Sequence, residues 1–534
     1  MAEIPVTLTV ESPVRLPVDS PLLEDASLAS LVPSISDSYG AVEDRYIQLA
    51  RAASAASDRM QSLRLAPKRS RLDNLFPETE TSLLIEIRMI AKSSLPLIAT
   101  LLLQYSLTVA SVYAVGNLGP NELAAVSLSN LLASISSYGI IQGIASALST
   151  LCPQAYGRKD YTTVGLQSLR CTCLLFLLYI PIFAIWYWGS YPLLYALVPE
   201  QRAAYLASIY LRRLVFGVPG FIVFEVVKQY LQAQGIFHAS TYVLVFCAPL
   251  NIILNLQLVN RYGFIGAPTA VVVTNWLMAI ALVIYAAVYG SLCWCGFSRE
   301  IFLHWSRLLA LAGPGVLMIE AEWLAFEIIA VASSRFGTTA LAAQSIVATA
   351  CVTAYQIPYA VSVAASTRVA WYIGSACRQA AISSTTASLL TALVSGSTNV
   401  TLLCLLRGQI ALLFSHEEPV VDLASHVLLV AGAYQLADSV SCVAGGILRG
   451  QGRQYIGGRL NLIGYYAIAL PISYLCGFVF NWELAGLWMG VLVALTTVAT
   501  AGTIAVLKSD WEGLIRKSVE DGVERYERAY EHGE

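Results

Sequence analysis

Charged residues are scarce in this sequence. Asp, Glu, Lys and Arg make up 12% of the 534 residues, whereas 57% are hydrophobic and the mean hydropathy is +0.65. Soluble domains contain about 25% charged residues. The composition therefore excludes a soluble globular chain and predicts an all-α integral membrane protein. The net charge of −2 supports neither a nucleic-acid partner nor a strongly acidic one.

Metal-binding and redox motifs are also missing. The sequence has 5 histidines, and most of its 11 cysteines lie inside apolar runs, where cysteine usually packs as a small core residue. Cys293 and Cys295 are too close together for common zinc spacing, and no second Cys or His pair is nearby. No paired intramembrane catalytic motif is present. We expect no metal, no cofactor and no enzymatic activity.

The first 80 or so residues lack the apolar stretch of a cleavable signal peptide. They are polar and rich in Ser and Pro, a composition typical of a disordered tail, with a short helix expected around residues 42–62. We divide the chain into a cytoplasmic tail at 1–82, a first lobe at 83–295, a second lobe at 296–508 and a cytoplasmic tail at 509–534.

Twelve apolar segments follow the tail, each long enough for the roughly 20 residues that a transmembrane helix needs. Basic loops such as Arg158-Lys159 and the segment 299–307 alternate with loops that carry few cations, one of them the acidic Glu417-Glu418. The positive-inside rule places both tails in the cytoplasm. We expect the protein in the plasma membrane or in a vacuolar membrane. The segments are about 86–113, 121–150, 164–188, 205–233, 240–259, 264–290, 303–333, 339–367, 380–407, 422–448, 456–479 and 485–507.

The two lobes repeat each other at a nearly constant offset. Pro96 and Pro314 are 218 residues apart, as are Gly119 and Gly337. An even number of spans in each repeat gives both lobes the same orientation, related by an axis along the membrane normal, with a cleft between them. This is a transporter architecture. Further matches are Leu123–Ala125 with Leu341–Ala343, Gly157 with Gly374, and Gln234-Gly235 with Gln451-Gly452.

Three carboxylates interrupt the apolar run 308–332, at Glu320, Glu322 and Glu327. An acidic residue at the centre of a transmembrane helix costs roughly +2.5 to +3.5 kcal/mol. These side chains must therefore face protein or water, or bind protons part of the time. Each outcome is what a site for protons or cations needs.

A set of motifs in both lobes is typical of one transporter family. The motifs are Gln104–Ser106, Val115–Gly119, Glu122–Ala125, Ser146–Gly157, Glu322–Glu327, Ala342–Ser345, Pro358–Val369 and Gly445–Gln454. With them the chain resembles the multidrug and toxic compound extrusion (MATE) transporters, in their eukaryotic branch, over about residues 85–507. The resemblance implies a secondary antiporter that exports small organic solutes, such as xenobiotics, organic cations or metabolites, in exchange for protons.

The resemblance also implies roles for three carboxylates. Glu322 and Glu327 match the family's Glu-Trp-Trp-Ala-Phe-Glu type motif, with Leu324 in place of the second Trp, and Asp438 matches an acidic position that is usually Glu. We expect these three to carry proton coupling or solute binding, because burial and neighbouring like charge favour a bound proton that an organic cation can displace. Glu320 has no counterpart, and we expect it closer to the membrane edge.

A weaker prediction concerns amides and aromatic side chains that line a solute pocket or pair between helices. Buried amides need partners, and an aromatic ring can stack on a planar cation, but ordinary helix packing explains the same residues. The candidates are Gln104, Tyr105, Asn130, Trp323, Phe326, Gln344 and Gln356.

The first lobe departs from the family pattern. Ser149 stands where many eukaryotic members carry an acid, and Asn117 where His is common. Thr349 replaces an acidic residue of some animal members, which weakens the expectation of strict organic-cation preference. We expect Glu225 and Lys228, three residues apart, to pair with each other.

Three arginines follow the tenth span. We expect Arg449, Arg453 and Arg459 on the cytoplasmic rim, where they cap helix ends or contact lipid headgroups; a role in solute selectivity is the alternative.

The leading prediction is a monomeric proton antiporter that works by alternating access between the lobes. A sodium-coupled exporter is the alternative within the family. A lipid-precursor flippase is a further alternative, but it would require a more basic central cavity than this sequence offers. A non-transporting membrane sensor is the alternative from another class.

Overall fold

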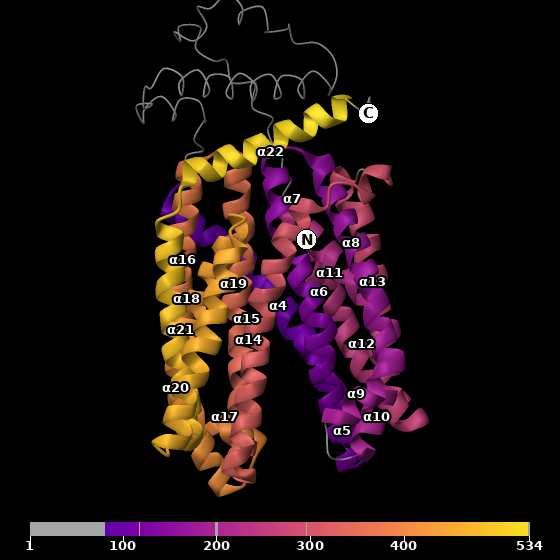
Figure 1. The fold of residues 1–534 in the computed structure, drawn as a ribbon, viewed down its shortest axis with the longest axis vertical. Helices are drawn as coiled ribbons and strands as arrows, with labels where there is room; N and C mark the ends of the chain where they lie inside the picture. The colour runs from indigo at the N-terminus through magenta and orange to yellow at the C-terminus, as the bar shows by residue number, and fades with distance from the viewer. Residues whose placement is uncertain (1–80, 117, 198–200, 295, 532–534) are drawn as a thin grey trace, which may run out of the picture. The chain divides into compact units, whose positions relative to one another are not determined.

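The computed structural model describes residues 81–116, 118–197, 201–294 and 296–531, and every regular element in these ranges is helical. The described residues up to 525 belong to one compact unit, whose helices are drawn in Figure 1. The helix predicted around 42–62 and the position Asn117 lie outside the described residues.

All six apolar segments of the first half are helical. Kinks and short π or 3₁₀ turns divide several of them into shorter pieces, a common feature of functional membrane helices. The elements are α4 (Leu83–Gly116), α5 (Pro120–Ala133), η1 (Ser134–Tyr138), α6 (Gly139–Ala145), α7 (Leu148–Gly157), α8 (Tyr161–Ala184), η2 (Ile185–Gly189), α9 (Ser190–Leu197), α10 (Gln201–Leu214), η3 (Val215–Gly217), α11 (Val218–Ala233), α12 (Ala239–Tyr262), η4 (Gly263–Ile265) and α13 (Gly266–Tyr289).

The second half follows the same plan after the connecting turns η5 (Ser291–Cys293) and η6 (Arg299–Phe302). Its elements are α14 (Ser306–Ser333), η7 (Ser334–Phe336), α15 (Thr338–Gly374), α16 (Arg378–Leu405), α17 (Arg407–Phe414), α18 (Glu418–Gly450), α19 (Gln454–Leu462), η8 (Ile463–Ala469), α20 (Leu470–Tyr474), η9 (Leu475–Val479) and α21 (Glu483–Leu507), followed by α22 (Trp511–Glu531).

Ten helical stretches in the described residues are long and apolar enough to cross a membrane. One of them, Ala239–Tyr289, contains both α12 and α13, and α14 with its three carboxylates is a further long helix. The twelve-span prediction therefore matches the helices, with each boundary moved by a few residues.

The internal repeat is visible in the backbone as well as in the residues. Corresponding turns of the two halves adopt the same rare positive φ, which glycine reaches without a steric penalty. The matching pairs are Gly119 (148°) with Gly337 (101°), Lys159 (63°) with Ala376 (60°), and Gly235 (80°) with Gly452 (71°).

The first helix of each half packs against the other half. Helix α4 contacts α15 and α16 as well as α12, and α14 contacts α6 as well as α19. Figure 1 shows both helices in the middle of the bundle. Two side-chain clusters are largely confined to one half each, whereas a third combines α4 residues with α15, α16, α18 and α21.

Hydrogen bonds join the halves where α7 meets α15 and α18, which we call the contact end. The Thr150 hydroxyl donates to the Arg449 carbonyl, Gln154 donates to the Gly450 carbonyl at 3.0 Å, and Gln454 donates to the Ser146 carbonyl at 3.2 Å. At the opposite end, α5 and the last turns of α14 diverge in Figure 1. We call this the far end.

A buried ion pair ties the beginning of α4 to α15 near the contact end. The Arg368 guanidinium donates to both carboxylate oxygens of Glu86, at 2.8 and 2.7 Å, and the Tyr372 hydroxyl donates to Glu86 at 2.7 Å. Glu86 is fully buried. A bidentate pair with a third donor satisfies a buried carboxylate well.

Removing one partner of this pair tests its structural role. We expect Arg368→Met to destabilise the protein by about 3–5 kcal/mol, because it leaves Glu86 buried without its cation. Thermal unfolding of detergent-purified protein measures the loss. The control is Arg516→Met, whose partner Glu520 is solvent-exposed, and equal shifts in the two variants would contradict the expectation.

Candidate functional site

The three carboxylates of α14 point to different surroundings. Successive residues of an α-helix are turned by about 100°, so Glu320 and Glu322 lie on nearly opposite faces. Glu322 faces the second half, as its neighbours below show, whereas Oε1 of Glu320 lies against Gly139 of α6 in the first half. Glu327 is half-buried nearer the far end. The stretch is therefore not a single acidic cluster.

Glu322 and Asp438 come together in the second half. Asp438 lies on α18 and is 3% exposed, and it interacts electrostatically with Glu322 of α14. The Tyr434 hydroxyl donates to Oδ2 of Asp438 at 3.3 Å. Two predicted carboxylates from helices far apart in the sequence thus share one buried region.

Tyrosines surround this pair. Tyr355 and Tyr359 of α15, Tyr434 of α18 and Tyr465 of η8 all interact electrostatically with Glu322. The rings of Tyr355 and Tyr359 are stacked with their centroids 5.7 Å apart. Phenol rings offer both a π face for a planar cation and a hydroxyl that donates to a carboxylate.

Arg449 supplies a positive charge next to the acids, in contrast to its predicted place on the rim. Its side chain is buried, donates from Nη2 to the Ser362 hydroxyl at 2.7 Å and interacts electrostatically with Glu322. The predicted contact of this side chain with lipid headgroups was wrong, because the last turn of α18 is buried at the contact end between Thr150 and Ser362. Arg453, by contrast, binds the last turn of α21 through the Ala505 carbonyl at 3.2 Å, as a helix cap should.

The aromatic neighbours of the site act mainly through packing. Phe326 contacts the rings of Tyr465 and Trp488, with centroids 6.1 and 6.2 Å apart. The Trp488 indole donates to Oε1 of Gln344 at 2.8 Å, which accounts for this buried amide as a structural partner. Trp323 is half-buried one residue after Glu322.

The first half carries a polar group of its own. Oε1 of Glu225 accepts from Lys228 at 2.6 Å and from Gln104 at 3.1 Å, which confirms the predicted Glu225–Lys228 pair. Tyr359 interacts electrostatically with Glu225 as well as with Glu322. This tyrosine therefore links the polar groups of the two halves.

The remaining candidates lie outside this cluster. The Tyr105 hydroxyl of α4 interacts with Thr349 of α15. Gln356 donates to the Val352 carbonyl of its own helix at 3.0 Å, and Asn130 is half-buried on α5.

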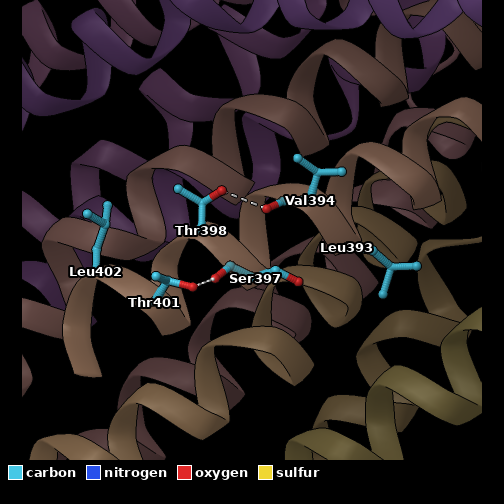
Figure 2. A pocket seen from close by; sticks show the side chains of 6 residues that line it. All are labelled: Leu393, Val394, Ser397, Thr398, Thr401 and Leu402. Atoms are coloured by element: carbon cyan, nitrogen blue, oxygen red, sulfur yellow. Dashed lines mark hydrogen bonds between the residues drawn. The ribbon is translucent and has the colours of Figure 1, made fainter. Parts of the chain in front are cut away.

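Figure 2 shows a surface hollow that lies apart from these residues. It is formed by α16 alone, from Leu393, Val394, Ser397, Thr398, Thr401 and Leu402. Thr398 and Thr401 donate to carbonyls of their own helix, at 2.9 and 2.8 Å. With these hydroxyls satisfied, the hollow is apolar in character, as expected of a helix face that contacts lipid.

No group of three or more His, Cys, Asp or Glu with metal-binding geometry occurs among the described residues.

The fold and the site define a class of protein, that of membrane transporters built from a tandem repeat. The features that define it are two similar halves, helices that cross between them and buried carboxylates near the centre.

Comparisons with known proteins define the family. The MatE family profile matches residues 96–256 and 314–475, one copy in each half. The chain belongs to the MatE family, and it is a transporter of the eukaryotic MATE type.

Relatives and a solved structure show how far the likeness extends. An uncharacterized transporter of Saccharomyces cerevisiae is 41% identical over 80% of this chain and 62% of its own length. Multidrug and toxin extrusion protein 2 of Mus musculus is 30% identical over 78% of this chain and 73% of its own. The crystal structure of the eukaryotic MATE transporter AtDTX14 superposes with a TM-score of 0.78 and 26% identity, covering 82% of this chain and 99% of that one.

Arg449 offers a test of the charge balance at the site. We expect Arg449→Met to lower stability by about 3 kcal/mol at neutral pH, because Glu322 loses its buried counter-charge. The loss should shrink under acidic conditions, since protonated carboxyls need no cation. Thermal unfolding across pH measures this, with Arg453→Met as the control. A loss for Arg449→Met that does not change with pH would count against the charge balance.

Proposed function

We propose that this transporter exports small organic solutes in exchange for protons, and that Glu322 and Asp438 carry the coupling. The observation behind the proposal is that these two carboxylates share one buried region with four tyrosines, and that Arg449 is the one cation among the described residues that interacts with Glu322 there. Two acids and one cation leave the region short of positive charge when both acids are ionised. A proton or an organic cation can supply it.

Competition for this missing charge gives the exchange. When a cationic solute enters, it replaces the proton as the partner of the carboxylates, and when it leaves, a proton must return. The stacked Tyr355–Tyr359 pair offers a surface for a planar solute. Because both ligands use the same carboxylates, they cannot be carried in the same direction at once.

Alternating access is the accompanying part of the proposal. The hydrogen bonds of the contact end hold the halves together there, while α5 and α14 diverge at the far end. The basic pair Arg158-Lys159 follows α7 at the contact end, so the positive-inside rule assigns this end to the cytoplasm. In the proposed cycle, the halves separate on the opposite side of the membrane in this arrangement. Glu327 lies toward that side, on the route of the exchanged ion. In this proposal the protein works as a monomer.

Neutralising one carboxylate tests the coupling. We expect Glu322→Gln and Asp438→Asn to reduce solute exchange driven by a pH gradient to the level of empty vesicles, because the amide can neither release a proton nor attract a cation. Purified protein in proteoliposomes is the assay. The control is Glu417→Gln, at an exposed position in the loop before α18. Unchanged exchange in a folded Glu322→Gln variant would refute the assignment.

The coupling ion is tested separately with the unmodified protein. We expect an imposed pH gradient to drive solute movement, and a sodium gradient of equal size to drive none. The reason is that Glu225, the carboxylate of the first half that interacts with Tyr359, is already paired with Lys228. Transport by sodium alone would favour the sodium-coupled alternative.

A further inference from the structure

Glu320 is a buried carboxylate that the mechanism above does not use. Both of its carboxylate oxygens are shielded from solvent and accept no hydrogen bond. It lies at the midpoint of α14, whose bounds are Ser306 and Ser333, and not near the membrane edge as the sequence suggested. A carboxylate at such a place ordinarily has a donor or a cation beside it.

The side chain is held between the two halves by a close contact of α14 with α6. A Cβ at Gly139 would clash with Oε1 of Glu320, and a Cβ at Gly143 would clash with the backbone of Val316. Gly315 lies equally close to the Gly143 carbonyl. Glycines four residues apart allow two membrane helices to approach this closely, so the Glu320 carboxyl is enclosed by backbone.

Glu320 lies where this contact ends. Helix α14 contacts α6 and η1, whereas α5, the preceding part of the same span, diverges from α14 in Figure 1. The π-helical turn η1 immediately precedes Gly139, and a second one, η8, borders α14 on its other side. Such turns often mark positions where a helix moves.

Among the described residues, the cations near α14 have other partners. Arg449 of α18, whose Nη1 lies 3.9 Å from Sδ of Met318, interacts with Glu322. The titratable neighbour with an electrostatic interaction is Tyr466 of η8. Tyr138 of η1 interacts with Asn275 and Phe221, away from α14. Arg459 of α19 lies over the ring of Tyr455.

The other titratable groups of the neighbouring elements belong to other surroundings. Tyr355 and Tyr359 of α15, like Tyr465 of η8, interact with Glu322. Glu483 is the first residue of α21 and Arg335 lies in η7, both remote from the middle of α14. Among the described residues, then, Glu320 has no counter-ion.

We propose that Glu320 is a second proton-binding site, separate from the Glu322–Asp438 pair, and that its proton is bound only while α14 contacts α6. An ionised carboxylate without donor or cation is strongly disfavoured in this setting, so the closed contact requires the neutral acid. When the contact opens, water reaches the carboxyl and the proton leaves. Proton binding at Glu320 therefore stabilises one arrangement of the halves.

This inference deepens the proposed function, because it gives the exchanged protons a second site that responds to the helix contact and not to the solute. Its test does not depend on transport. The protonated carboxyl has a C=O stretching band in infrared spectra that differs from the bands of a carboxylate. Full-length protein in lipid nanodiscs, without solute, is the sample.

The first measurement compares the unmodified protein with Glu320→Gln near neutral pH. We expect the variant to lose one protonated-carboxyl band and no carboxylate band, whereas Glu417→Gln should lose only carboxylate intensity. Loss of a carboxylate band on replacing Glu320 would overturn the proposal. Glu320→Leu, which fills the same apolar space without polar atoms, gives the same comparison if the Gln variant does not fold.

The second measurement is hydrogen exchange of the segment that contains η1 and α6. After correction for chemical exchange, we expect the unmodified protein to exchange faster at about pH 8 than at about pH 6, since loss of the Glu320 proton loosens the contact. The ratio of the corrected exchange rates at these two pH values should be close to one in Glu320→Gln. In Glu322→Gln it should equal the ratio of the unmodified protein. A Glu320→Gln variant that keeps the pH dependence of the unmodified protein would also refute the proposal. Failure of the proposed function would appear differently, as unchanged transport in Glu322→Gln. It would not change the expected results of the infrared and hydrogen-exchange measurements.

Discussion

A carboxylate inside a low-dielectric helix bundle must be paired, hydrated or protonated, and the arrangement of this protein follows from that constraint. Glu86 is paired with Arg368, and Glu225 with Lys228. Glu322 interacts with Arg449, and Asp438 interacts with Glu322 and accepts a hydrogen bond from Tyr434. Only Glu320 has both oxygens buried without a partner among the described residues. Stability explains the paired acids, and the acids with too little positive charge are the ones available for function.

The first helix of each half packs against the other half, and this packing links the carboxylates to the relative position of the halves. Because α4 packs against α15 and α14 packs against α6, any change in the relative position of the halves must alter contacts made by these two helices. Both carry or contact carboxylates. Helix α14 presents Glu322 to its own half and Glu320 to the other half, so in the proposed mechanism this one helix responds both to the solute and to the position of the opposite half.

Much of this fold could be predicted from local sequence. The twelve apolar segments, the two repeats and the Glu225–Lys228 pair depend on hydrophobicity, fixed spacing and helix geometry, all of which are local. The placement of Arg449 and Glu320 was predicted wrongly. Arg449 follows a long apolar helix and resembles a rim residue, yet α18 ends inside the bundle against Ser362. Glu320 has no motif around it, and its burial depends on Gly139 and Gly143, which precede it by nearly two hundred residues.

The sequence by itself determined the class of protein, the number of spans, the repeat and the presence of carboxylates in the seventh and tenth spans. These properties follow from composition and periodicity, because each span must satisfy its own backbone in the membrane. Only the tertiary structure decided which carboxylates meet, which cation lies beside them and which acid remains alone. Those outcomes depend on how helices distant in the chain cross and on the glycines that let them approach, and neither leaves a local pattern in the sequence.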